Sequence, residues 1–428
     1  MNSENNNTPQ ENNESVIVEL PLKNSKKKKS FSSKKSDYNG PRLSPLALGI
    51  IAAIILIIIY IIADISSGGF IYTVNGKFQS VLTKSSSQNY AVEINADSVF
   101  DFEAHGDGFM LLTENGVSFV EKNGELVSGQ QMVYSTPLAD VNGKNIVIYD
   151  KGNSSYTLMH NRAIISQQKL EDRIVDFAVS KDNNYAIVLR DDNYKTVLIG
   201  CNSKGKIIYQ WNCSDGYITD VAINDNGNKV AVSVINSTNA VLSSHIYILD
   251  FEYDSAYAEF EYTDETVIGA KFLTDRKIQV ITDKNVYRIS GKNQTVSSEY
   301  GTQDIICTDF SEKYTAVITK DYSHDDTYIL SLFKSNGKLK YSVTLNGKVT
   351  GLSISDKSVA VLFSDKIETY SKSGKLVGSI TDTKHYDGIV INKNFIYVLS
   401  SDTVRRFPAY GNMSYEPQIV EDETHVEE

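Results

Sequence analysis

The stretch IVDFAVSKDNNYAIVL, residues 174–189, contains the pattern that decides the fold. It begins with an apolar residue, any residue, Asp and an apolar residue. A polar turn and an apolar segment that contains alanine follow. Short runs of Val, Ile, Phe and Tyr bounded by polar turns are typical of β-strands. The stretch therefore predicts two neighbouring strands joined by a hairpin turn.

The same pattern occurs eight times, with Asp or Gly at its third position. The spacings between these positions run from 36 to 49 residues, with a mean of 41. A period of about 40 residues with four strands in each copy is typical of β-propeller blades. The third positions are Asp101, Asp140, Asp176, Asp220, Gly269, Asp309, Gly351 and Gly388.

We therefore predict an all-β chain that folds into a β-propeller of eight four-stranded blades. Seven blades remain an alternative, because the two longest spacings flank Asp220. The last copy has only three candidate strands before Pro408. Its fourth strand would come from the start of the domain, either Tyr90–Ile94 or Phe78–Leu82, which would close the ring and remove an exposed sheet edge.

A long apolar stretch precedes the repeats. Residues 46–63, LALGIIAAIILIIIYIIA, carry no charge. As a helix they would be about 27 Å long, close to the hydrocarbon thickness of a bilayer. The sequence predicts one transmembrane helix over residues 45–64, and the side chains expected in the bilayer include Leu46, Ile50, Ile54, Ile58 and Ile62.

The basic residues before this segment predict its orientation in the membrane. Residues 1–44 carry eight Lys or Arg and five Asp or Glu, and Lys26–Lys29 form a basic cluster. Basic residues before a transmembrane helix remain in the cytoplasm. We therefore expect a single-pass protein of the cell membrane with a disordered, basic cytoplasmic tail, whose Lys26–Lys29 cluster contacts anionic lipid.

The remaining segments would then lie outside the cell. Residues 65–89 are expected to form a linker with a candidate first strand, and residues 90–408 an extracellular propeller. Residues 409–428 are expected to form a disordered acidic tail. The formal net charge of the chain is −11, which argues against a nucleic-acid partner.

The repeats resemble WD40-like and related bacterial propeller repeats, although the Trp-Asp dipeptide of true WD40 repeats is absent. The whole layout resembles an uncharacterised family of single-pass membrane proteins from Gram-positive bacteria. The members of that family carry an exported propeller domain, WD40-like or quinoprotein-like, of unknown function. The resemblance covers about residues 45–408 and implies no catalytic residues. Quinoprotein propellers use recurring tryptophans, and Trp211 is the only one here, so no quinone cofactor is expected.

The candidate site is the centre of the predicted ring. Its innermost strands would carry Asp101, Asp140, Asp176, Asp220 and Asp309 near a channel. Clustered carboxylates could hold Ca²⁺ or a cationic ligand. The favoured interpretation is that crowded inner strands need a small residue at this position, where an Asp bonds to amides of the neighbouring blade. Gly at three of the eight positions favours this interpretation. No other cofactor, metal site or catalytic residue is predicted.

The three cysteines, Cys201, Cys213 and Cys307, are expected to be small, mostly buried residues, with a disulfide as the minor alternative. The leading functional expectation is a non-enzymatic docking or scaffold module for a protein or a cell-wall ligand. One alternative is an extracellular enzyme that acts on glycans or peptides, which would require converging channel carboxyls with raised pKa values. Another is a sensor that signals through the helix to residues 1–44.

Overall fold

The computed structural model describes residues 82–84, 91–94, 96–238, 241–300, 303–321, 327–382 and 384–414. The chain divides into two units, Met1–Tyr60 and Ile61–Glu428, and all described residues belong to the second. The predicted cytoplasmic tail and transmembrane segment, with Leu46, Ile50, Ile54, Ile58 and Ile62, lie outside the described residues. Within the described ranges, no helix is long and apolar enough to cross a membrane.

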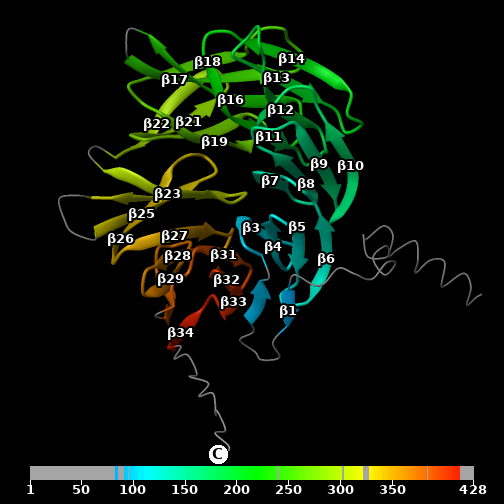
Figure 1. Cartoon of the computed structure of the whole chain (residues 1–428). Coiled ribbons are helices and arrows are strands. Elements are labelled where there is room, and N and C mark those ends of the chain that lie inside the picture. The colour runs from blue at the N-terminus through cyan, green and yellow to red at the C-terminus, as the bar shows by residue number, and fades with distance from the viewer. Residues whose placement is uncertain are drawn as a thin grey trace, which may run out of the picture. The chain divides into compact units, whose positions relative to one another are not determined.

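Eight antiparallel sheets form a closed ring, which confirms the eight-bladed propeller (Figure 1). From the centre outward, blade 1 consists of β3 (Val99–His105), β4 (Gly108–Thr113), β5 (Gly116–Val120) and β6 (Leu126–Gln131). Blade 2 consists of β7 (Pro137–Asn142), β8 (Asn145–Asp150), β9 (Ser155–His160) and β10 (Ala163–Lys169). Blade 3 consists of β11 (Ile174–Val179), β12 (Tyr185–Arg190), β13 (Thr196–Cys201) and β14 (Ile207–Cys213). Blade 4 consists of β15 (Tyr217–Ile223), β16 (Lys229–Thr238), β17 (Val241–Asp250) and β18 (Ala258–Thr263).

The second half of the ring repeats this order. Blade 5 consists of β19 (Val267–Thr274), β20 (Lys277–Thr282), β21 (Asn285–Ser290) and β22 (Asn293–Glu299). Blade 6 consists of β23 (Asp304–Phe310), β24 (Tyr314–Lys320), β25 (Thr327–Lys334) and β26 (Leu339–Asn346). Blade 7 consists of β27 (Val349–Ile354), β28 (Ser358–Phe363), β29 (Lys366–Ser371), β30 (Leu376–Thr381) and β34 (Gly411–Ser414). Blade 8 consists of β31 (Gly388–Asn392), β32 (Phe395–Leu399), β33 (Thr403–Pro408), β2 (Ala91–Ile94) and β1 (Leu82–Lys84).

The ring is closed by a strand from the start of the domain. Strand β2 pairs antiparallel with β33, with Val92 opposite Val404. This confirms the first of the two predicted closing segments, Tyr90–Ile94. Strand β1 lies outside β2 as a fifth strand. Because β2 comes from one end of the domain and β33 from the other, closure ties the two ends together (Figure 1).

The structured chain continues beyond the predicted boundary at Pro408. Strand β34 pairs in parallel with β30, with Gly378 opposite Gly411. A Cβ at Gly378 would lie 2.7 Å from the carbonyl oxygen of Ala409, so only glycine allows the chain to approach this closely. Of the residues expected to form the acidic tail, 409–414 therefore belong to the propeller.

The core lies between the blades. Strands β4, β8 and β28 are buried along their whole length, because the face on either side of each packs against a neighbouring blade. Such strands read as continuous apolar runs rather than as alternating patterns. This packing explains the apolar segments, such as Tyr185–Leu189, that follow the polar turn in most repeats.

The repeated sequence pattern encodes a β-bulge. In blades 1, 3, 4, 5 and 7 the register of the first strand shifts immediately before the Asp or Gly. The variable residue of the pattern is therefore the extra, bulged residue, and a bulge re-aims the side chain that follows it. The bulged residues are Phe100, Val175, Thr219, Ile268 and Thr350.

Candidate functional site

The five predicted aspartates all lie on first strands, but they form two layers of the channel rather than one. Asp176 accepts a hydrogen bond from the amide of Val221, which is one residue after Asp220. Asp140 instead accepts one from Val179, which is three residues after Asp176. The partner of Asp140 is thus two residues further along the next first strand than the partner of Asp176. Asp140 therefore lies two residues, or one inward-facing position, further along its own strand than Asp176 does.

The first layer contains Asp101, Asp176 and Asp220. The second layer lies two residues further along each first strand and contains Glu103, Asp140, Lys271, Asp309 and Ser353. Asp140 and Asp309 match the sequence pattern, but they lie one inward-facing position further along the channel than Asp101, Asp176 and Asp220. Blade 2 has no bulge in its first strand, and the bulge of blade 6 precedes Cys307 instead of Asp309.

Most of these side chains join one blade to the next. Besides Asp140 and Asp176, the Asp309 carboxylate accepts a hydrogen bond of 2.7 Å from the amide of Ile354. The Ser353 hydroxyl accepts one of 3.0 Å from the amide of Ile391 in the same way. In blade 7 the first-layer residue is Gly351, which has no side chain to accept a hydrogen bond. A Cβ added to it would lie 3.2 Å from the Ile389 side chain, so the two blades approach closely at this point.

Sequence reasoning missed three second-layer residues: Ser353, which bridges two blades, and Glu103 and Lys271, which do not. Within the described part of the chain, Glu103 accepts no hydrogen bond, in contrast to Asp140 and Asp309. Lys271 cannot accept one, and its ammonium lies 5.6 Å from the centre of the Phe310 ring. The signal that could have identified all three residues is their position, two residues after the Asp or Gly of the repeat, on the same side of the strand.

The channel carboxyls hold their protons more tightly than usual. Burial raises the pKa of Asp101, Asp140 and Asp309 to about 6 and the pKa of Asp220 to about 7. Burial also raises the pKa of Asp176. The pKa of Glu103 is raised well above its usual value, first by burial and then by the negative charges of nearby aspartates. Lys271 opposes that rise for Glu103.

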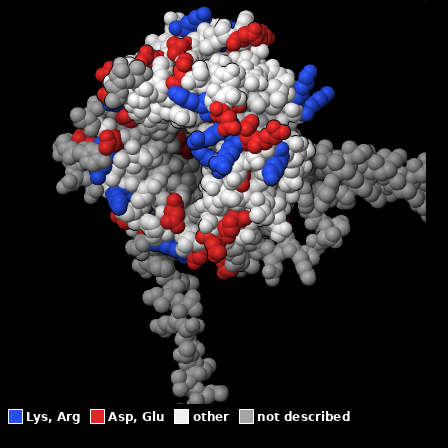
Figure 2. Space-filling model, turned by 45° about the horizontal axis from the view of Figure 1, so that its top comes forward, with Lys and Arg blue, Asp and Glu red and all other residues white. Residues whose placement is uncertain are grey.

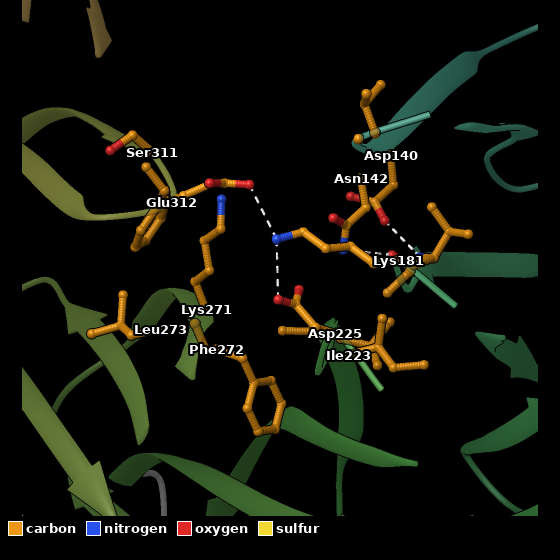
Figure 3. Close-up of a pocket in the computed structure, with 18 of the residues that line it drawn as sticks. Asp140, Asn142, Lys181, Ile223, Asp225, Lys271, Phe272, Leu273, Ser311 and Glu312 are labelled. Carbon is orange, nitrogen blue, oxygen red and sulfur yellow. Dashed lines mark hydrogen bonds and ion pairs between the residues drawn. The ribbon is translucent and has the colours of Figure 1, made fainter. Parts of the chain in front are cut away.

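Two cavities share the channel. One, of about 440 Å³, is lined by Asp140, Asp220 and Lys271, and its mouth is bridged by Lys181 (Figure 3). The Lys181 ammonium lies 3.1 Å from both the Asp225 and the Glu312 carboxylates. The second cavity, of about 560 Å³, also borders Asp140 and Lys271 and contains Glu103 and Asp309 in its lining.

The two cavities place carboxyl groups around the Lys271 side chain, and Lys181 adds a second ammonium at the mouth of the first cavity. In the ranges that the structure describes, no three His, Cys, Asp or Glu side chains are placed to hold a metal ion. Binding of Ca²⁺ or of a cationic ligand in the channel stays a prediction. All three cysteines are free, and Cys201 and Cys213 are buried while Cys307 is half-buried.

The two faces of the ring differ in charge. The turns between second and third strands and the connections between blades lie on one face, named here the acidic face. Its described connections carry fifteen acidic and six basic residues, a formal charge of −9. They are Asp97, Glu114, Glu171, Asp172, Asp191, Asp192, Asp215, Asp264, Glu265, Asp283, Asp321, Asp365, Asp382, Asp387 and Asp402, with Lys151, Arg173, Lys195, Lys284, Lys348 and Lys384.

The opposite face, named here the basic face, carries the turns between first and second and between third and fourth strands. Its described turns contain ten acidic and fourteen basic residues, a formal charge of +4. Lys181, Asp225 and Glu312 belong to this face, so the ion pairs of Figure 3 lie at its channel mouth. In the view of Figure 2 the ring is hollowed near its centre, and basic and acidic side chains gather beside the hollow.

Exposed apolar side chains gather on the acidic face of blades 4 to 6. Strands β16 and β17 pair over ten residues each, but β15 pairs with β16 only as far as Ile235 and β18 reaches only Ser243. The rest of the hairpin therefore projects as a two-stranded tip. Its Val241 and Leu242 are 46% and 41% exposed. Tyr217, Ile268 and Ile306 are also exposed, each within the first three residues of its first strand.

Hydrogen bonds fix the projecting tip beside blade 5. The Asp264 amide donates to the carbonyl oxygen of Leu242 over 3.1 Å, and the Val267 amide donates to the Ser244 hydroxyl over 3.2 Å. Ile268 follows Val267 directly, so it lies next to the hairpin. We name Tyr217, Val241, Leu242, Ile268 and Ile306 the apolar patch. The 49-residue spacing between Asp220 and Gly269 was the sequence signal of this insertion.

A further cavity lies at the rim between blades 2 and 3. It measures about 590 Å³ and is lined by apolar side chains that include Ile165, Tyr185 and Ile207. Ile207 and its neighbour Ile208 are exposed on β14, the outermost strand of blade 3. This rim groove is the second apolar surface open to solvent.

Comparison with known proteins identifies the fold. The model of a family described as a family of unknown function (DUF5711) matches residues 77–409. No curated protein matches the chain. The C-terminal WD40 domain of Sif2 is similar with a TM-score of 0.51 and 14% identity, over 76% of this chain and 93% of that one.

Two other solved structures are similar at lower scores. BamB from Moraxella catarrhalis has a TM-score of 0.47 and 13% identity, over 76% of this chain and all of that one. The Cps50 (Swd1) propeller domain from Myceliophteria thermophila has a TM-score of 0.41 and 9% identity, over 64% of this chain and 96% of that one. At these identities the likeness concerns the fold alone.

Proposed function

We propose that this chain, which belongs to the DUF5711 family of unknown function, is a membrane-anchored, extracytoplasmic docking module without enzymatic activity. Its propeller would bind a protein partner through the apolar patch on the acidic face. The observation that carries this proposal is the projecting hairpin, which presents Val241 and Leu242 to solvent. Exposed apolar side chains grouped on one face of a protein can mark a site of interaction.

The hairpin tip supports docking by its geometry. An isolated two-stranded hairpin is only marginally stable in water, and aliphatic side chains on it gain nothing from exposure. Contact with a partner would bury Val241 and Leu242 together with Ile268, which is held beside the hairpin by the hydrogen bond between Val267 and Ser244. The rigid blades would hold the patch in place before the partner arrives, which lowers the entropy cost of binding.

Membrane anchoring rests on residues 45–64 and the basic cluster Lys26–Lys29 before them. The direction of β1 places its first residue, Leu82, at the acidic face, and β34 ends at the same face with Ser414. The first and last residues that the structure describes therefore lie at the same face. Digestion of intact cells from outside should remove the propeller, whereas a tag before residue 44 should stay protected. Protection of both parts would contradict the proposed orientation.

Crosslinking in living cells tests the docking proposal. The tagged full-length chain should capture a protein of the membrane or the cell wall, and a chain that lacks residues 69–408 should not. The double variant Val241→Thr and Leu242→Thr places threonine, which favours strands, at both positions and removes the apolar tip. We expect it to lose the captured protein.

The matched control is Ile207→Thr with Ile208→Thr, which removes two adjacent exposed aliphatic side chains from β14, of which Ile207 lines the rim groove. This control should retain capture. Loss of capture in the control alone would move docking to the rim groove. Retention of the same partner by both variants would contradict the apolar patch as the docking surface.

One observation favours a second candidate function, an enzyme that acts on glycans or peptides in the channel. Carboxyls with raised pKa values in a cavity are typical of acid–base sites, and Glu103 and Asp220 have such values. Glu103 would act as the acid, because its oxygens hold no neighbouring blade. Glu103→Gln should abolish any hydrolysis of glycan or peptide substrates by the full-length chain, and Glu125→Gln, on an exposed turn of the same blade, should not.

A further inference from the structure

We infer that the partner of the apolar patch presents a basic segment that also carries aliphatic or aromatic side chains. This inference rests on the proposed docking function and adds the chemistry of the partner. Its basis is that the apolar patch lies on the face whose connections carry a formal charge of −9, whereas the opposite face carries +4. A partner is selected by complementary charge as well as by apolar contact.

Acidic side chains border the apolar patch directly. Asp215 precedes Tyr217 by two residues, Asp304 precedes Ile306 by two, and both carboxylates are exposed. Asp264 is exposed beside the hairpin, since its amide bonds to the Leu242 carbonyl. Asp283 is exposed in the neighbouring turn of blade 5. Each apolar element of the patch therefore has an anionic neighbour.

In the described turns and connections from the start of blade 3 to the end of blade 6, the acidic face has two basic residues; Arg173 comes just before blade 3 and Lys348 just after blade 6. Lys284 is paired with Asp264 over 2.8 Å, and Lys195 lies 5.5 Å from the centre of the Tyr217 ring. The net charge around the apolar patch is therefore negative. This charge would repel an anionic polymer or an anionic lipid surface at distances up to the screening length. A cationic segment is attracted over the same distance, and its apolar side chains can then contact the patch.

This surface has the composition expected of a docking site for a basic amphipathic segment. Aromatic and aliphatic side chains at the centre would supply the contact area, and the carboxylates around them would set orientation and association rate. The exposed Tyr217 ring could in addition stack on a guanidinium or ammonium group of the partner.

The test uses the purified full-length chain in detergent and a fluorescent peptide of alternating leucine and lysine. Two further peptides serve as probes, one of alternating leucine and glutamate and one of alternating serine and lysine. We expect the leucine–lysine peptide to bind at least about tenfold more tightly than either other peptide, and to weaken about tenfold when NaCl rises from about 0.1 M to about 0.5 M.

Charge variants locate the site. Asp215→Lys with Asp264→Lys should weaken binding of the leucine–lysine peptide by about tenfold or more. The matched control, Glu252→Lys with Asp254→Lys, changes two exposed acidic residues of blade 4 on the opposite face and should have no effect. Val241→Thr with Leu242→Thr should also weaken binding, which separates docking at the patch from general attraction to an acidic protein.

The failures of the two proposals are distinguishable. If the hairpin variant loses its partner in cells while Asp215→Lys with Asp264→Lys keeps it, docking at the patch stands and the basic partner is wrong. Equal binding of the leucine–glutamate peptide would overturn the inference in the same way. Equal loss from the charge variant and its control would show that the attraction is not localised, which also overturns it.

Discussion

The ammonium of Lys181 in blade 3 and the carboxylate of Glu312 in blade 6 lie 3.1 Å apart across one mouth of the central channel, although 131 residues separate them. Lys181 also contacts Asp225 in blade 4 at 3.1 Å. One lysine thus connects two adjacent blades and a blade on the far side of the ring. The pair bridges the channel mouth on the basic face, whereas the apolar patch is on the acidic face.

The Lys181–Glu312 pair should contribute little to stability. The two side chains are 42% and 69% exposed, so water and salt screen the attraction. A double-mutant cycle with Lys181→Gln and Glu312→Gln should give a coupling energy below about 1 kcal/mol. Urea unfolding of the four proteins measures it. A coupling of several kcal/mol would show that the ring depends on this contact for closure.

Ring closure should depend on β2 instead. The Val92 side chain is completely buried and packs against Tyr397, Leu399 and Val404 of blade 8 and Phe109 of blade 1. Val92→Ala should lower the free energy of unfolding by about 2 kcal/mol, from lost burial and from the cavity left behind. Val133→Ala is the control, because Val133 is 96% exposed and should change nothing measurable. Equal stability of both variants would contradict closure by β2.

Stability should fall as the pH rises from about 5.5 to about 8. Burial raises the pKa of Asp140 from 3.8 to about 6, and the pKa of Asp101 and of Asp309 likewise. The folded chain therefore holds these protons more tightly than the unfolded chain. The resulting stabilisation is complete below the unfolded value and is lost as the pH rises through about 6 to 7, where Asp220 also titrates.

Asp140→Asn tests this pH dependence at one residue. The amide oxygen can still accept the hydrogen bond from Val179, but the group no longer ionises. Between about pH 5.5 and about pH 8, the melting temperature of the variant should change less than that of the parent chain. An exposed aspartate that bonds nothing in the channel, Asp254→Asn, is the control. A parent chain that gains stability over this range would contradict raised channel pKa values.

Much of the fold could be predicted from the repeated pattern, because each copy is a local signal. An apolar residue, a bulged residue and an Asp or Gly mark the first strand, and the alanine-containing run marks the second. Eight copies predicted eight blades, and the missing last strand predicted closure by a strand from the start of the domain, either Tyr90–Ile94 or Phe78–Leu82. These features depend on neighbouring residues in the sequence and on the need to remove a sheet edge.

The site could be predicted only in part, because its geometry depends on register. Asp140 and Asp309 match the pattern but lie one layer further along the channel, and a missing or displaced bulge is not visible in the residue types. Glu103 and Lys271 follow the Asp or Gly of the repeat by two residues, at a position where the residue type changes from copy to copy. The apolar patch combines Tyr217 and Leu242 of blade 4 with Ile268 of blade 5 and Ile306 of blade 6, and only the folded ring determines that they share a face.

A photo-reactive amino acid placed in the full-length chain gives the most direct test of docking through the acidic face. It would replace Leu242 in one variant and Ile208 in another, and the cells would be irradiated while intact. The account predicts a discrete protein adduct from position 242, with a basic segment at the crosslinked site, and none from position 208. An adduct from position 208 alone, or none from either position, would contradict it.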